Sequence, residues 1–168
     1  MLAIGIGKIL SAISHIFSKE SRDWVFILWW LTLLGGMLSH WVSVWSLRSN
    51  EHWTAAEFFL LMLSPLLYYA AAHVLISSAP ERIQSWSAHL SSVARLLLSL
   101  FLLVMCNFLL RNFVILEDFS PPLAFSLLLA CIACLTSITI AFPKRWLLGA
   151  SAAAWLMPVI FAVVVTDF

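Results

Sequence analysis

Residues 24–47 read WVFILWWLTLLGGMLSHWVSVWSL and contain no Asp, Glu, Lys or Arg. A helix needs about 20 predominantly apolar residues to cross the hydrocarbon core of a bilayer. Because the backbone finds no water to bond inside that core, a helix is the default structure for such a segment. This stretch therefore predicts a transmembrane helix.

The whole chain has the composition of a membrane protein. It is 63% hydrophobic and only 10% charged, whereas a soluble domain carries about 25% charged residues. The chain has too few polar groups to cover a surface in water, so we expect the lipid bilayer as its solvent and bound lipid on its surface. The net charge of +1, without a basic stripe, argues against a nucleic-acid partner.

Four further segments are long and apolar enough to span a membrane, and charged or turn-forming residues separate them. We predict an all-α membrane protein with five transmembrane helices in a single domain, residues 23–168. The last two segments are crowded and can alternatively form a re-entrant pair. The four further spans are residues 53–76, 93–115, 121–142 and 146–165.

Lysine and arginine counts predict the orientation. From the N-terminus, the successive connections, each counted together with the adjoining ends of the spans, carry three, one, two, one, two and zero of these residues. Positive residues gather on the cytoplasmic side of membrane proteins. The alternation therefore predicts a cytoplasmic N-terminus and a C-terminus outside.

Two segments are predicted to lie on the membrane surface. In residues 1–22, apolar residues such as Leu2, Ile6 and Ile9 recur at steps of three and four, with polar residues on the opposite face. This pattern is typical of an amphipathic interfacial helix. Residues 80–92 repeat it more weakly.

Aromatic and histidine residues gather at the first connection. Trp41, Trp45 and Trp53 fit an aromatic belt at the outer interface, where the ring is apolar and the indole N–H finds a partner. At 1.5 Å per residue, His40 falls in the outer leaflet and His73 near the cytoplasmic side. Because these depths differ, the two histidines are not expected to share a haem, and we predict no metal site.

The small residues of the last two spans indicate helix packing. The motif Cys131-Ile132-Ala133-Cys134 lies in the middle of a span, where cysteine behaves as a small buried hydrophobe. In the last span, Gly149 and Ala153 have the small-xxx-small spacing that lets two helices approach closely.

Polar residues inside spans are costly in lipid and are candidates for function. His40, Glu57, Asn107 and Arg111 are all predicted in the outer leaflet, where Glu57 can pair with Arg111. The cluster fits either an ion pair that fixes helix register or a small vestibule for an ion, a proton or a polar ligand.

A second candidate pocket lies deeper in the predicted second span. Pro65 kinks this helix and frees a backbone carbonyl one turn earlier. Ser64, Tyr68, Tyr69 and His73 follow closely and are predicted to line an inner pocket for a quinone or a lipid head.

The first half of the chain resembles a broad group of small, uncharacterised multi-pass bacterial membrane proteins. The resemblance rests on the tryptophan-rich first connection, on Trp53-x-x-x-x-Phe58 and on Leu63-Ser64-Pro65-x-x-x-Tyr69. It implies a bacterial inner membrane and transfers no activity or functional residue.

The sequence contains no GxSxG, HExxH or glycine-rich phosphate loop, so we do not expect an enzyme. We expect a non-enzymatic membrane component that acts by assembly, as a homo-oligomer or with other membrane subunits, and no cofactor. The main alternative is an oligomeric ion channel with the outer polar cluster at its entrance. A second alternative is a redox subunit that binds haem or quinone.

Overall fold

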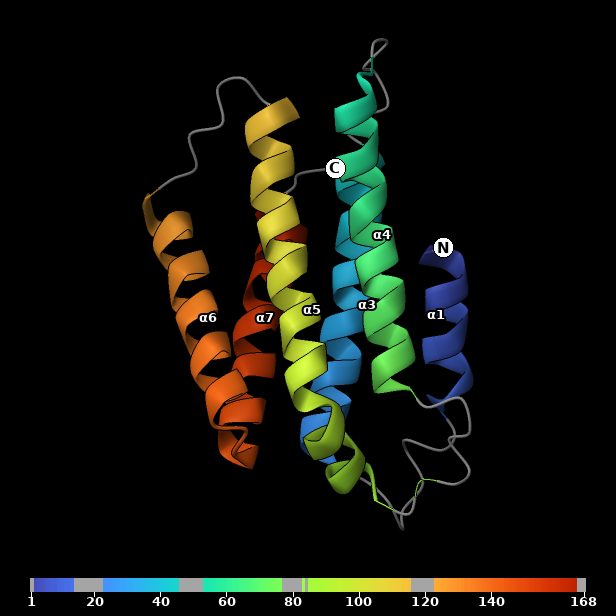
Figure 1. Ribbon diagram of the computed structural model, residues 1–168, viewed down its shortest axis with the longest axis vertical. Coiled ribbons are helices and arrows are strands. Elements are labelled where there is room, and N and C mark those ends of the chain that lie inside the picture. The colour runs from blue at the N-terminus through green and yellow to red at the C-terminus, as the bar shows by residue number, and fades with distance from the viewer. Residues whose placement is uncertain are drawn as a thin grey trace.

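The computed structural model describes residues 2–13, 23–45, 53–76, 83, 85–115 and 123–165. Within these ranges the chain forms helices and no strand (Figure 1). The helices are α1 (Leu2–Ser11), α3 (Trp24–Trp45), α4 (Ala55–Leu75), α5 (Trp86–Ile115), α6 (Leu123–Ala141) and α7 (Arg145–Val165). The predicted all-α class is confirmed.

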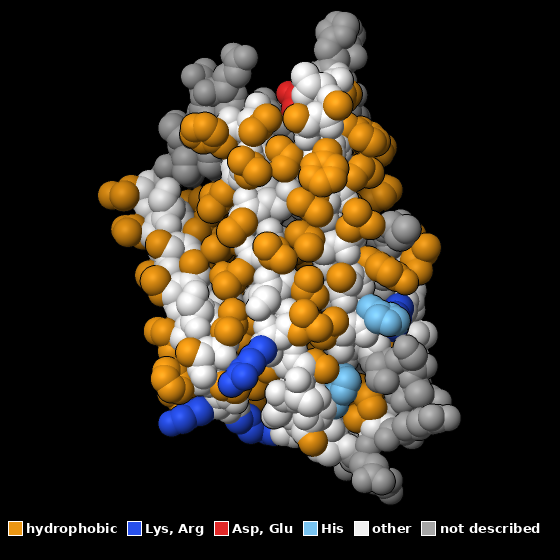
Figure 2. Space-filling view, viewed as in Figure 1, with side chains coloured by type: hydrophobic (Ala, Val, Ile, Leu, Met, Phe, Trp, Pro, Cys, Tyr) orange, Lys and Arg blue, Asp and Glu red, His pale blue; other side chains and the backbone are white. Residues whose placement is uncertain are grey.

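Four of these helices, α3 to α6, are long and apolar enough to cross a membrane. They coincide with the first four predicted spans, and the described part of α7, residues 145–160, is a shorter apolar helix. Apolar side chains cover much of the face shown in Figure 2, as expected for helices that meet lipid. The chain therefore has the character of a multi-pass membrane protein.

The helices stand side by side and run alternately up and down (Figure 1). Helix α3 lies at the centre, packed against α1, α4, α5 and α7, while α6 lies at the edge against α5 and α7. We call the end where α3 and α5 begin the lower end, and the end where α4 begins the upper end. The core is built mainly on one face of α3, where Phe26, Trp29, Leu33 and Met37 are fully buried.

Local hydrogen bonds fix where α3 begins. The Asp23 Oδ1 accepts from the backbone N–H groups of Val25 and Phe26, at 2.9 and 3.2 Å, which otherwise lack partners at a helix start. The other oxygen, Oδ2, lies 3.0 Å from Arg145 Nη1 at the start of α7. Arg145 also donates to Ser87 near the start of α5. This group ties three helices together at the lower end.

Helix α1 differs from the predicted interfacial helix. It stands beside the lower half of α4 instead of lying across the bundle (Figure 1). Ile9 is fully buried, and its carbonyl accepts a hydrogen bond from Trp30 Nε1 at 3.0 Å. Ile6 and Ile9 of the predicted apolar face thus pack against protein. Lys8 contacts His73, and burial lowers the pKa of the Lys8 amine. Residues 14–22 lie outside the described ranges.

The second predicted surface helix is also different. Residues 86–92 belong to α5, which continues without a break into the third span for 30 residues. Such a helix is about 45 Å long, whereas the hydrocarbon core is about 30 Å thick. The helix is therefore long enough for its first turns to extend beyond the hydrocarbon core as a straight continuation of the span. Of residues 80–85, only 83 and 85 are described.

Helices α3 and α7 pack closely along a face that includes one of the two predicted small residues. A Cβ atom on Gly149 would lie 2.7 Å from the ring of Trp24. Trp29 Nε1 donates to the Leu148 carbonyl at 3.1 Å, and Ala152 is fully buried. Ala153 is exposed, because the face of α7 that contacts α3 carries Gly149 and Ala152, three residues apart, instead of Gly149 and Ala153.

The edge position of α6 explains the exposure of its cysteines. Only one face of this helix is covered, and it carries the buried residues Leu129, Ile132, Thr136 and Thr139. Cys131 and Cys134 lie on the exposed side, as does Cys106 of α5. The expectation that the cysteines of this span are buried is therefore wrong.

Candidate ligand-binding cavity

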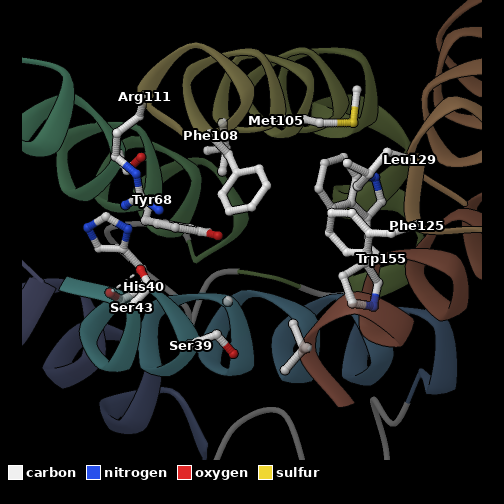
Figure 3. A pocket seen from close by; sticks show the side chains of 15 residues that line it. Ser39, His40, Ser43, Tyr68, Met105, Phe108, Arg111, Phe125, Leu129 and Trp155 are labelled. Atoms are coloured by element: carbon white, nitrogen blue, oxygen red, sulfur yellow. Dashed lines mark hydrogen bonds between the residues drawn. The ribbon is translucent and has the colours of Figure 1, made fainter. Parts of the chain in front are cut away.

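A cavity of about 330 Å³ lies in the upper part of the bundle. Helices α3 to α7 all contribute to its wall, so five segments that are separate in the sequence meet there. Polar side chains gather at one end and apolar side chains at the other (Figure 3). The cavity is therefore amphipathic along its length.

The polar end brings together one side chain from each of three helices. His40 comes from α3, Tyr68 from α4 and Arg111 from α5, and the three lie beside one another in Figure 3. The ring centroids of His40 and Tyr68 are 6.1 Å apart. Ser39 and Ser43 of α3 add hydroxyl groups to this end. The Ser43 hydroxyl already donates to the His40 carbonyl at 2.9 Å, and the other four side chains can donate a hydrogen bond to a ligand.

The apolar end is formed mainly by α5, α6 and α7. Trp155 faces Phe125 and Leu129 there, with Met105 and Phe108 nearby (Figure 3). The indole N–H of Trp155 donates to Thr136 Oγ1 at 3.0 Å and is therefore already satisfied. The ring offers the cavity an apolar surface only.

Two side chains of the polar end are buried with polar atoms that find no hydrogen-bond partner among the described residues. Arg111 is 3% exposed and His40 is 7% exposed. The atoms concerned are Nε and Nη1 of Arg111 and Nε2 of His40. The guanidinium does lie 5.5 Å from the ring centroid of Phe108, one turn earlier on α5. Buried polar groups are normally bonded, so these atoms mark a place where a ligand fits.

Gly36 sets the position of Tyr68. A Cβ atom at Gly36 would lie 2.9 to 3.2 Å from three atoms of the Tyr68 side chain, closer than such contacts allow. The missing side chain on α3 thus makes room for the phenol of α4 beside the cavity. The adjacent pair Gly35-Gly36 in the middle of a span was the sequence signal for this close approach.

Asn107 connects α4 and α5 next to the cavity. Its Nδ2 donates to the Leu60 carbonyl at 3.0 Å and to Ser64 Oγ at 2.6 Å. Pro65 carries no N–H, so the helical hydrogen-bond ladder of α4 is interrupted at this turn. Asn107 is 4% exposed and belongs to the support of the cavity wall.

Glu57 lies apart from the other members of the predicted outer cluster. Its Oε2 accepts from the backbone N–H and the hydroxyl of Thr54, at 2.7 and 2.8 Å, and Thr54 Oγ1 accepts from the Glu57 N–H. This reciprocal arrangement is a capping box at the start of α4. The expected pairing of Glu57 with Arg111 is not formed, because the carboxylate is engaged at its own helix end.

The residues of the predicted inner pocket divide between two sides of α4. Ser64 and Tyr68 line the cavity, with His40 and Arg111 of the outer cluster. Tyr69 and His73 face away from it, with ring centroids 6.4 Å apart and His73 beside Lys8 of α1. The predicted outer cluster and the predicted inner pocket, which the sequence placed at different depths, therefore contribute residues to the same cavity.

The depth assignment was wrong because α3 and α4 are shifted along each other by more than the prediction assumed. His40 follows Trp24 by 16 residues and Tyr68 follows Trp53 by 15, yet their rings are close. The two helical stretches together measure about 46 Å, well above a core of about 30 Å. Trp24 and Trp53 therefore do not both mark the edge of the hydrocarbon, as the prediction assumed.

In the part of the chain that the structure describes, no group of three His, Cys, Asp or Glu side chains is arranged to hold a metal ion. Comparison of the chain with protein-family models, with curated proteins and with solved structures finds no match. The resemblance to small multi-pass bacterial proteins stays a prediction.

Proposed function

We propose that this protein is a non-enzymatic membrane component that binds an amphipathic molecule in its intramembrane cavity. The observation that carries the proposal is the division of the cavity into two ends. Hydrogen-bond donors, three of whose atoms lack partners, occupy one end, and aromatic and aliphatic side chains occupy the other. A molecule with a polar head and an apolar chain satisfies both ends at once.

The size of the cavity fits part of such a molecule. A volume of about 330 Å³ lies in the range of small-molecule sites. At ~30 Å³ for each water-sized group, it holds about eleven of them. That is enough for a head and the first part of a chain, and the remainder of a long chain extends into the surrounding lipid.

We further propose five transmembrane helices in a bacterial inner membrane, with α7 as the fifth and the lower end in the cytoplasm. Arg95 and Arg145 lie in the lower parts of α5 and α7, and Lys144 lies in the connection between α6 and α7. Lys and Arg side chains gather at this end in Figure 2. Such a bias favours the cytoplasmic side. Exposed Trp24 and Trp146 near this end, and Trp41 and Trp45 towards the other, fit two interfacial belts.

The alternatives from the sequence have less support. The ion-channel alternative placed Glu57 at the entrance of a pore, but Glu57 forms the capping box of α4. The cavity is lined by helices of one chain, so binding in it does not require a homo-oligomer. Assembly with other subunits is compatible with the exposed apolar faces. A quinone head accepts hydrogen bonds and fits the donors, so a bound quinone or haem is an outcome that the test must recognise.

Native mass spectrometry tests the proposal, with the protein extracted gently from its own membranes. We compare the natural sequence with Met105→Trp, which fills the cavity, and with Leu103→Trp, which adds the same ring on the 52% exposed face of the same helix. The expected result is one amphipathic molecule per chain in the natural protein and in Leu103→Trp, and its loss in Met105→Trp. Equal retention by all three proteins, or a bare natural protein, contradicts the proposal. A haem mass replaces it with the redox alternative.

A further inference from the structure

The charge of the cavity wall points to the chemistry of the ligand head. Arg111 of α5 carries a formal positive charge, and the titratable groups that face it are His40 of α3 and Tyr68 of α4. The residues that α6 and α7 contribute, such as Phe125 and Trp155, are uncharged. No carboxylate of the described residues lines the cavity, and Glu57 is engaged by Thr54. The described residues therefore supply no counter-charge at this site.

An uncompensated charge is unfavourable in such a place. Arg111 is almost fully buried, in a part of the bundle surrounded by apolar helices. Moving an ion out of water costs free energy that only a good partner of opposite charge and further hydrogen bonds offset. Phe108 offers its ring to the guanidinium but no negative charge. None of the described residues supplies the missing partner.

The donors at this end suit an acidic group better than a neutral one. Guanidinium geometry matches the oxygens of carboxylates and phosphates, and hydrogen bonds in which both groups are charged are the stronger ones. His40 Nε2 has no partner, and the hydroxyl of Tyr68 points into the cavity (Figure 3). Together they can reach further oxygens of the same head. A neutral alcohol or a quinone carbonyl fills one such position but leaves the charge of Arg111 unbalanced.

We infer that the ligand is an acidic lipid, whose carboxylate or phosphate monoester binds Arg111 while its chain lies against Trp155 and its neighbours. This inference rests on the proposed function of the cavity and specifies the ligand class. His40 and Tyr68 orient the head from the side of α3 and α4. The ligand completes the charge balance of the bundle, so binding stabilises the fold.

Four proteins and three probes test the inference in nanodiscs of zwitterionic lipid at alkaline pH. The probes, lauric acid, lauryl phosphate and lauryl alcohol, share one chain and differ only in the head. Equilibrium binding of the radiolabelled probes is measured against empty nanodiscs. For the natural protein we expect saturable binding of both acids, and binding of the alcohol at least about tenfold weaker, since a charge-assisted bond is worth that much.

The arginine variants identify the group that recognises the head. Arg111→Met is expected to lower the affinity for both acids to that for the alcohol and to leave the alcohol unchanged, which shows that the cavity is intact. Arg111→Lys retains the charge and is expected to keep a preference for the acids. Arg95→Met removes an exposed arginine from the same helix and is expected to behave as the natural protein.

The outcomes separate the two levels of the proposal. If lauryl alcohol binds as tightly as the acids, or if Arg111→Met leaves the preference for acids in place, the inference of an acidic head is overturned and the binding function stands. If none of the probes binds saturably, the proposed function itself is overturned. Binding of only one of the two acids supports the inference and identifies the head as carboxylate or phosphate.

Discussion

Replacing Asn107 by leucine removes the polar connection between α4 and α5 while keeping a side chain of similar shape. The change deletes the hydrogen bonds to the Leu60 carbonyl and to Ser64 Oγ. Interhelical hydrogen bonds in membrane proteins contribute about 0.6 kcal/mol on average and at most about 1.7. Removal of the unpartnered Oδ1 of Asn107 offsets part of the loss. We expect the free energy of unfolding to fall by about 1 kcal/mol.

The control is another asparagine on α5. Asn112 donates to the Phe108 carbonyl of its own helix at 2.7 Å and is half-buried. Asn112→Leu therefore loses no bond between helices, and its unfolding free energy should stay within about 0.5 kcal/mol of the natural protein.

Reversible unfolding in mixed micelles with increasing SDS, followed by circular dichroism, measures both changes. The Ser64→Ala variant completes a double-mutant cycle, in which the effects of Ser64→Ala and Asn107→Leu should add to more than that of the double variant. If Asn107→Leu is as stable as the natural protein, or if the two changes are simply additive, the proposed role of Asn107 is refuted.

Two further substitutions examine the cavity wall and the lower end. Gly36→Ala should push the ring of Tyr68 into the cavity and weaken ligand binding by about tenfold, since overpacking costs about 1–3 kcal/mol. The control Gly7→Ala places its new Cβ where no atom lies within 4 Å and should leave binding unchanged. Asp23→Asn keeps a good helix cap and loses the ion pair with half-exposed Arg145, so the unfolding free energy should fall by about 1 kcal/mol; an unchanged value rules out a stabilising pair.

The sequence identifies the individual polar residues of the cavity but does not predict that they lie close together in space. His40, Arg111 and Asn107 could be singled out because polar side chains are costly inside a span, and Tyr68 because it follows Pro65. That His40 and Tyr68 lie at one level depends on how far α3 and α4 are shifted along each other. This shift is set by tertiary contacts, among them the approach of Tyr68 to Gly36.

Two predictions differ from the structure although the local sequence contains evidence against them: the pairing of Glu57 with Arg111 and the surface position of the N-terminal helix. Thr54-Ala55-Ala56-Glu57 has the Thr-x-x-Glu pattern of a capping box, which places the Glu57 carboxylate at a helix start. In α1, Gly5 permits the close approach to Met37, as expected for a helix that packs on protein. Periodicity alone does not distinguish an apolar face that enters lipid from one that packs on a neighbouring helix.

The central claim is that the cavity holds the head of an amphipathic molecule beside Arg111. A crystal structure of the protein grown from a lipid phase tests it most directly. We expect elongated density that runs from Trp155 to Arg111 and ends in a group with an acceptor atom within hydrogen-bond distance of Arg111 Nε or Nη1. A closed cavity without density, with Arg111 turned outward to Glu57, would contradict it.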